Sequence, residues 1–147
     1  MIRSYIAENR ARFMEEWASL IRIPSISCQP AHKDDMLRCA ERWRELLLEA
    51  GAQHAEVMPS KGNPFVYAEY SPMEVEGERL EVKGKNIPTV LVYSHYDVMP
   101  VEPLDLWQSN PWEPTIREGR LYARGADDDK GQAMIQVKAF EYLVKHG

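Results

Sequence analysis

The stretch Thr89-Val90-Leu91-Val92-Tyr93 is continuously β-prone and largely apolar, and it decides how the sequence around it is interpreted. A short run of this kind favours a central strand buried on both faces, as in a mostly parallel sheet. The polar stretch Ser94-His95-Tyr96-Asp97 follows at once. Because ligands in open α/β sheets bind beyond the carboxyl ends of the strands, we expect His95 and Asp97 to project into such a crevice.

Helices are predicted on both sides of this strand. Apolar residues spaced by three or four positions predict a first helix from about Ile2 to Leu20. Pro24 ends it, because proline lacks the N–H and clashes with the preceding turn. A last helix is predicted from about Lys130 to Lys145. Its inward-facing residues are Met134, Val137, Phe140 and Val144.

A second helix has the cleanest apolar period in the chain. Its apolar face is formed by Met36, Ala40, Trp43, Leu47 and Ala50. Asp34 or Asp35 is the predicted N-cap, and Gly51 is the predicted residue just beyond the C-cap. Cys39 lies beside the apolar face and is interpreted as a small buried residue.

Short strands are predicted between these helices. They are His54–Met58, Pro64–Tyr70, a loose edge hairpin around Gly77 that includes residues 78–83, and a strand pair over 115–123 that turns at Glu118-Gly119. The order of elements predicts an α/β fold, a three-layer sandwich with a mostly parallel mixed sheet. The chain stops just after a helix, so we expect this sandwich to be incomplete.

Composition excludes several classes of protein. The 147 residues are enough for one domain, and 44% hydrophobic with 28% charged residues argues against disorder. A net charge of −5 without a Lys/Arg stripe argues against nucleic-acid binding. No apolar run approaches a membrane span, and we expect a cytoplasmic protein. Cys28 and Cys39 are too few for a disulfide framework and form no CxxC pair.

The His95-Tyr96-Asp97 triplet has the chemistry of a metal ligand with its partner. Residues i and i+2 of an extended segment point to the same side, so both side chains would project together. Histidine binds zinc well, and a neighbouring carboxylate can fix its tautomer and raise its basicity. The alternative is an ordinary histidine at a strand end followed by an aspartate that starts a turn.

Three successive acids, Asp127-Asp128-Asp129, precede the last helix. Helix capping explains one or two of them, because an aspartate accepts hydrogen bonds from free N–H groups and favours the positive end of the helix dipole. Three adjacent carboxylates repel one another unless a cation is close. Carboxylates are zinc ligands, and one can bridge two metal ions.

The two polar segments and the residues between them match, with small departures, the motif of a known protein family. It reads H-x-D-V-x-P, then W, then P-F-x-P, then D-G-x-L-Y-G-R-G-x-x-D-D-K-G. The matching residues are His95 to Pro100, Trp107, Pro111 to Pro114 and Glu118 to Gly131. In this the sequence resembles the zinc aminoacylase and carboxypeptidase family. That family includes carnosinase-like dipeptidases, acetylornithine deacetylase, succinyl-diaminopimelate desuccinylase and glutamate carboxypeptidase.

Departures from the pattern are small. Trp112 replaces phenylalanine, Glu118 replaces aspartate and Ala123 replaces glycine, and none of these is a presumed ligand. The first helix and the stretch Ile23-Pro24-Ser25-Ile26-Ser27 also look like the opening of the family. The resemblance therefore extends over the whole chain and is tightest from Val90 to Gly131.

The resemblance implies roles for particular residues. His95 would bind one zinc ion, and Asp128, the first acid of D-D-K-G, would bridge two zinc ions. Asp97 would be the residue usually counted as catalytic, orienting His95 and tuning the metal site. Asp129 is expected to cap the helix and Asp127 lies at a variable position, but the choice of bridging acid among the three stays open. Cobalt and manganese are alternative metals.

The resemblance also implies residues that the sequence lacks. The family's general base is a glutamate of a downstream Glu-Glu pair, and a further aspartate and a distant histidine complete the ligand set. These would follow Gly147. The pair Glu15-Glu16 is interpreted as a solvated helix face, and His32, His54 and His146 lie in no family motif.

The function implied is zinc-dependent hydrolysis of a peptide or amide bond in dipeptides or short peptides by the full-length protein, expected to be a homodimer. Deacylation of N-acyl amino acids and a non-catalytic α/β binding module stay open as alternatives. Another zinc aminopeptidase family with H-x-D fits less well, because it lacks R-G-x-x-D-D-K-G. Residues 1–147 would be the N-terminal portion of the catalytic domain, without its remainder or the lid and dimerisation domain. Alone, we expect them to be inactive, to bind zinc weakly and to self-associate through an unpaired sheet edge.

Overall fold

The computed structural model describes residues 1–72, 74–75, 78–79 and 88–147. Its helices are α1 Ile2–Ile21, α2 Lys33–Glu49 and α3 Lys130–His146, with short 3-10 turns at Pro30–His32 and Leu104–Leu106. Its strands are β1 His54–Met58, β2 Phe65–Glu69, β3 Glu74–Val75, β4 Glu78–Arg79, β5 Thr115–Arg117 and β6 Arg120–Tyr122. Over these described ranges, no helix is both long and apolar enough to cross a membrane.

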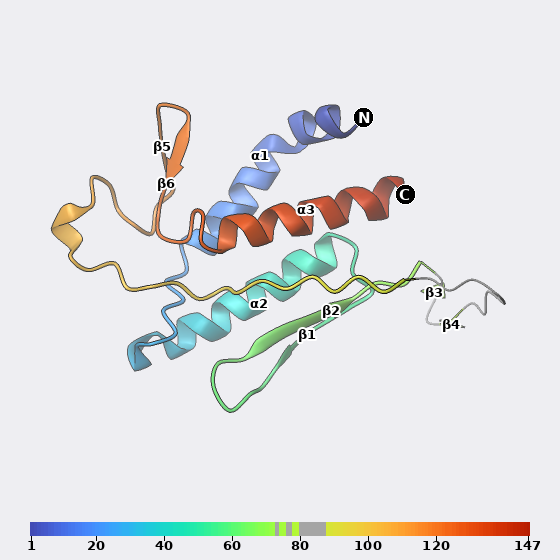
Figure 1. Cartoon of the computed structure of the whole chain (residues 1–147), viewed down its shortest axis with the longest axis horizontal. Coiled ribbons are helices and arrows are strands. Elements are labelled where there is room, and N and C mark those ends of the chain that lie inside the picture. The colour runs from blue at the N-terminus through green and yellow to red at the C-terminus, as the bar shows by residue number, and fades with distance from the viewer. Residues whose placement is uncertain (73, 76–77, 80–87) are drawn as a thin grey trace.

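Helix α2 lies between two layers (Figure 1). Helices α1 and α3 are on one side of it, and the β1–β2 hairpin is on the other. The core forms where the three helices meet, and its buried residues are Leu20, Cys39, Trp43, Leu46, Ala50, Ala133, Met134 and Val137. The predicted inward faces of the second and last helices are thus confirmed, as is the burial of Cys39.

The predicted start of α2 is wrong, while its predicted end is confirmed. The N-cap is His32, and Asp34 and Asp35 lie in the first turn of the helix. The 3-10 turn at Pro30–His32 leads directly into α2, so the helix begins earlier than the acids indicate. Gly51 has a φ of 108° and donates its N–H to Leu48 O, a conformation that glycine adopts without strain.

The strand pairs are antiparallel in the described part of the chain. Strands β1 and β2 pair with Val57 opposite Val66, and β5 and β6 turn at Glu118 and Gly119, whose φ angles are 50° and 76°. The predicted strand His54–Met58 is confirmed, the predicted strand over 64–70 is present as Phe65–Glu69, and the predicted pair over 115–123 is confirmed. Strands β3 and β4 also pair, whereas residues 80–83 of the predicted edge hairpin lie outside the described residues.

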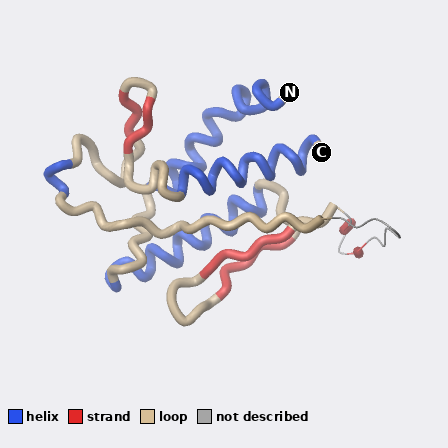
Figure 2. The backbone as a smooth tube through the Cα atoms, in the orientation of Figure 1, coloured by secondary structure: helices blue, strands red, loops and turns tan. Residues whose placement is uncertain are grey.

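The central strand predicted over residues 89–93 is wrong. Residues 89–93 are part of a longer loop that crosses the molecule (Figure 2), and no strand of the described residues pairs with them. Val90 is 80% and Leu91 is 89% exposed. A doubly buried strand needs hydrogen-bonded neighbours on both sides, and the described residues supply none. The parallel pairing predicted for the sheet is therefore not present in this part of the chain.

Candidate functional site

The segment that bears His95 and Asp97 is held by a loop far away in the sequence. The Ser25 hydroxyl donates to Tyr96 O at 2.7 Å, and Val98 N donates to Ser25 O at 2.9 Å. On the other side, the Tyr96 hydroxyl donates to Pro64 O at 2.5 Å. These bonds fix the backbone on both sides of Asp97, although the segment belongs to no strand.

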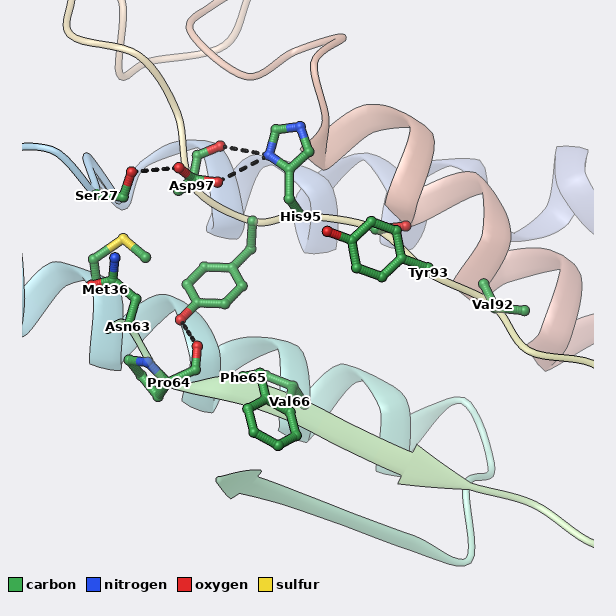
Figure 3. Close-up of a pocket in the computed structure, with 12 residues that line it drawn as sticks. Ser27, Met36, Asn63, Pro64, Phe65, Val66, Val92, Tyr93, His95 and Asp97 are labelled. Atoms are coloured by element: carbon green, nitrogen blue, oxygen red, sulfur yellow. Dashed lines mark hydrogen bonds and ion pairs between the residues drawn. The ribbon is translucent and has the colours of Figure 1, made fainter. Parts of the chain in front are cut away.

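The imidazole of His95 lies between two carboxylates. Its Nδ1 is 3.1 Å from Asp97 Oδ1, and its Nε2 is 3.0 Å from Asp128 Oδ1. The His95 and Asp97 side chains point toward one another on the same side of the segment (Figure 3). The i, i+2 prediction is confirmed in geometry, and Asp128 joins the pair from the loop before α3.

Asp97 has a second partner that the sequence did not indicate. The Ser27 hydroxyl donates to Asp97 Oδ2 at 2.5 Å (Figure 3). Each oxygen of this carboxylate therefore has its own contact, one to Ser27 and one to His95. The sequence feature that could have pointed to Ser27 is the stretch from Ile23 to Ser27, which resembles the opening of the family but was given no role.

The loop that bears Asp128 is packed against the end of α1. Lys130 is completely buried, and its ammonium donates to Leu20 O at 2.9 Å and Ile23 O at 2.7 Å. These carbonyls at the C-terminal end of α1 favour a cation. Gly131 permits a close approach, because a Cβ there would lie 2.2 Å from Ala126 O. Backbone packing and a buried ammonium thus set the position of Asp128.

The other two acids of the triplet take different roles. Asp129 is the N-cap of α3, as predicted, but no cap hydrogen bond from its side chain is present. Its Oδ2 instead accepts the backbone N–H of His95 at 3.0 Å. Asp127 Oδ1 is 3.3 Å from Gln132 Nε2. Of the three acids, Asp128 is the one that reaches the imidazole.

The electrostatics of the site favour a cation between His95 and Asp128. Burial lowers the pKa of His95, but the hydrogen bonds to Asp128 and Asp97 outweigh this and leave the pKa above its usual value. A carboxylate accepts only, so the contact at Nε2 needs a proton or another positive centre. A divalent metal ion would displace that proton and take its place.

A cavity of about 350 Å³ opens beside these groups, and its lining includes His95, Asp97, Arg124 and Asp128. Across the described ranges, no three histidine, cysteine or acidic side chains form a ready metal cluster. Asp97 faces Nδ1, on the other side of the ring from Asp128, so it does not share a cation with Nε2. The residues therefore fit a metal ion as two ligands, fewer than the three or four protein ligands of typical zinc sites.

The remaining acid and histidine candidates lie in other contacts. Glu15 is exposed as predicted, but Glu16 is buried and pairs with Arg12 and Lys138, so the solvated-face interpretation is wrong for Glu16. The three other histidines contact neighbours outside the site. These contacts are His32 with Asp35, His54 with Glu56 and His146 with Tyr142.

The chain is similar to known proteins of one peptidase family. Residues 91–147 match the family model of Peptidase family M20/M25/M40. A cysteinylglycine-S-conjugate dipeptidase of Corynebacterium striatum is 31% identical over 97% of the chain and 29% of the relative. A succinyl-diaminopimelate desuccinylase of Azoarcus is 48% identical over 42% of the chain and 16% of the relative.

A solved structure shows the same fold. The M20 family metallo-carboxypeptidase Sso-CP2 of Sulfolobus solfataricus superposes with a TM-score of 0.73 and 33% identity, over 90% of this chain and 27% of the other. The likeness confirms the α/β fold class and agrees with an incomplete sandwich. The chain spans between 12% and 29% of the length of the first curated relatives that it matches.

The matched residues include the motif that contains His95, Asp97 and Asp128, and the likeness to relatives reaches over nearly the whole chain. The resemblance indicated by the motifs is therefore confirmed, and the chain contains part of a domain of Peptidase family M20/M25/M40.

Proposed function

We propose that the protein containing this chain is a metal-dependent peptidase that hydrolyses dipeptides or short peptides. The observation that carries the proposal is the 3.0 Å approach of His95 Nε2 to Asp128 Oδ1, with Asp97 behind the imidazole. The dipeptidase named above matches 97% of the chain, which supports a peptide as the substrate.

The roles proposed for the site residues follow from their contacts. His95 would bind a zinc ion through Nε2, and Asp128 would be the ligand shared between two zinc ions, with cobalt or manganese as alternatives. Asp97 acts through His95 and not on the substrate: it accepts from Nδ1 and so holds the ring in the orientation that directs Nε2 toward Asp128. When bound, zinc supplies the Lewis acidity that activates a water molecule and polarises the scissile carbonyl.

The proton transfer of amide hydrolysis needs a general base. The described residues lining the cavity at His95 and Asp128 include no glutamate. We therefore propose that the general base and the missing metal ligands come from outside the 147 residues. The 147 residues alone are then inactive. The dipeptidase relative, of which the match covers 29%, is longer than this chain, which supports this division.

The test uses the full-length protein. Metal-stripped protein is reconstituted with zinc and assayed on unblocked dipeptides, with the variant His95→Ala and the matched control His54→Ala, an exposed histidine of β1. We expect zinc to restore hydrolysis in the unmodified protein and in the control, and His95→Ala to lose it. Hydrolysis by His95→Ala at the rate of the control would overturn the proposal.

A specific observation supports deacylation as a second candidate. The desuccinylase relative is 48% identical over 42% of the chain, whereas the dipeptidase is 31% identical over 97% of it. The motifs build the metal site and leave the substrate pocket open. Adding N-succinyl and N-acetyl amino acids to the same assay separates the two, since a deacylase prefers them to unblocked dipeptides.

A further inference from the structure

We propose that Ser27 is a positioning residue of the metal site, which fixes the carboxylate of Asp97 and through it the imidazole of His95. The inference rests on the proposed function, because it assigns to Ser27 a part in metal binding. Ser27 Oγ is 2.5 Å from Asp97 Oδ2, and Asp97 Oδ1 is 3.1 Å from His95 Nδ1. The three side chains form one continuous chain of hydrogen bonds that ends at Asp128.

The loop that bears Ser27 is built to hold this position. Ser25 is completely buried and Ile26 is 3% exposed. The backbone bonds Ser25 N to Ile23 O and Ile26 N to Pro24 O, each 2.8 Å, give the loop a tight fold. Ser27 is therefore presented from a fixed backbone rather than from a free surface turn.

The same loop also holds the segment that it orients. The Ser25 carbonyl accepts from Val98 N, and the Ser25 hydroxyl donates to Tyr96 O. These two bonds, one on each side of Asp97, fix the distance between the loop of Ser27 and the segment of Asp97. With both backbones fixed, the hydroxyl of Ser27 selects the rotamer of Asp97. Without it, one carboxylate oxygen loses its donor and the side chain is free to rotate away from His95.

The size of the effect follows from the general behaviour of outer partners of metal ligands. Groups that orient a ligating histidine change metal affinity by about 10- to 100-fold when they are removed. Ser27 is one contact further from the metal than Asp97, so we expect the lower end, an about tenfold loss of zinc affinity for Ser27→Ala.

The experiment uses the full-length protein and four variants of it. Ser27→Ala removes the hydroxyl without adding volume, and Ser27→Thr and Ser27→Val have the same shape but differ in the hydroxyl. Ser4→Ala is the matched control, an exposed serine at the start of α1. Zinc affinity is measured by competition with a chromophoric chelator. In the metal-free protein, three-bond NMR couplings to Asp97 Cγ report whether this side chain keeps one rotamer.

Support requires both readouts. Ser27→Ala and Ser27→Val should bind zinc about tenfold more weakly and average the Asp97 rotamer, while Ser27→Thr and Ser4→Ala stay near the unmodified protein. The inference is overturned if Ser27→Ala keeps either the zinc affinity or the single rotamer, or if the threonine variant is no better than the valine variant. A protein that binds no zinc refutes the proposed function, whereas the rotamer readout still separates the threonine variant from the valine variant.

Discussion

The ammonium of Lys130 lies 2.9 Å from Leu20 O, and this contact joins the first residue of α3 to the last turn of α1. It also donates to Ile23 O, so one buried cation contacts two carbonyls that also accept the backbone N–H groups of Ile23 and Ser25. The loop with Asp128 is two residues away. The site and the packing of two helices therefore depend on the same side chain.

Replacing this lysine should destabilise the protein. Lys130→Met keeps the apolar stem but removes two hydrogen bonds from a charged donor, so we expect a loss of about 1–3 kcal/mol in the free energy of unfolding. The exposed Lys33 at the start of α2 gives the control Lys33→Met, for which the change should stay within about 0.5 kcal/mol. Urea unfolding measures both, and equal midpoints would contradict the role of Lys130.

Glu141 should make the stability pH-dependent. It is completely buried in α3 and accepts from Tyr5, Arg12, Lys138 and Lys145. Burial raises its pKa, but these donors outweigh burial and hold the pKa well below the usual range. A carboxylate with a depressed folded-state pKa stabilises the fold above its unfolded pKa of about 4.3, and this contribution is lost as the pH falls further.

The variant Glu141→Gln should therefore unfold more easily at pH 7 and lose less stability in acid. We expect a cost of about 2–3 kcal/mol at pH 7, below the 3–5 kcal/mol of a fully buried pair, because the Arg12 and Lys145 side chains are 38% and 46% exposed. Urea unfolding at pH 7 and at pH 4 measures both effects. Glu8→Gln in α1 is the exposed control, and identical pH slopes in all three proteins would rule this account out.

Local patterns explain which elements were predictable from the sequence. The apolar face of α2 and its end at Gly51 depend on residues three or four positions apart, which a sequence pattern shows directly. The β5–β6 turn at Glu118-Gly119 depends on two adjacent residues. The start of α2 was not predictable from the acids, because the turn begun by Pro30 overrides them. The strand prediction for residues 89–93 is wrong because an apolar run shows β-propensity but not whether a partner strand is present.

The site was predictable only as far as its motif residues. His95, Asp97 and Asp128 stand in two short motifs, and the structure brings them together. Ser27 and Lys130 act through partners 70 and 107–110 residues away, and no local pattern shows such pairings. Glu16 was misassigned for the same reason, since its partner Lys138 lies in another helix.

Gly131 should tolerate no side chain. A Cβ there would lie 2.2 Å from Ala126 O, a backbone atom that cannot give way without moving the loop of Asp128. Although alanine is the better helix former by about 1 kcal/mol, we expect Gly131→Ala to lose about 1–3 kcal/mol, because overpacking against backbone costs more. Gly62→Ala is the control, where the nearest atom is 3.9 Å away. A thermal midpoint for Gly131→Ala at or above that of the unmodified protein would contradict this clash.

The exposed segment 89–93 should make the 147-residue chain self-associate. Val90, Leu91, Val92 and Tyr93 are each more than 60% exposed, and such unpaired apolar segments favour association. Sedimentation velocity over a range of concentrations measures this. Leu91→Lys should reduce association, whereas Leu106→Lys, at an exposed leucine outside the segment, should not. A compact monomer at all concentrations would refute the expectation.

Substitution of each acid in turn should decide which one binds the metal. Asp128 faces His95 Nε2, Asp129 accepts from the His95 backbone and Asp127 contacts Gln132. Asp128→Asn removes the proposed metal ligand, so we expect its zinc affinity to fall by more than the about 10- to 100-fold that removal of an outer partner costs. Asp127→Asn should bind as the unmodified protein does, and Asp129→Asn should fall between the two because its contact positions the histidine. Zinc competition experiments on the full-length variants give the order of their zinc affinities. A loss of zinc affinity in Asp127→Asn as large as that in Asp128→Asn would reassign the ligand.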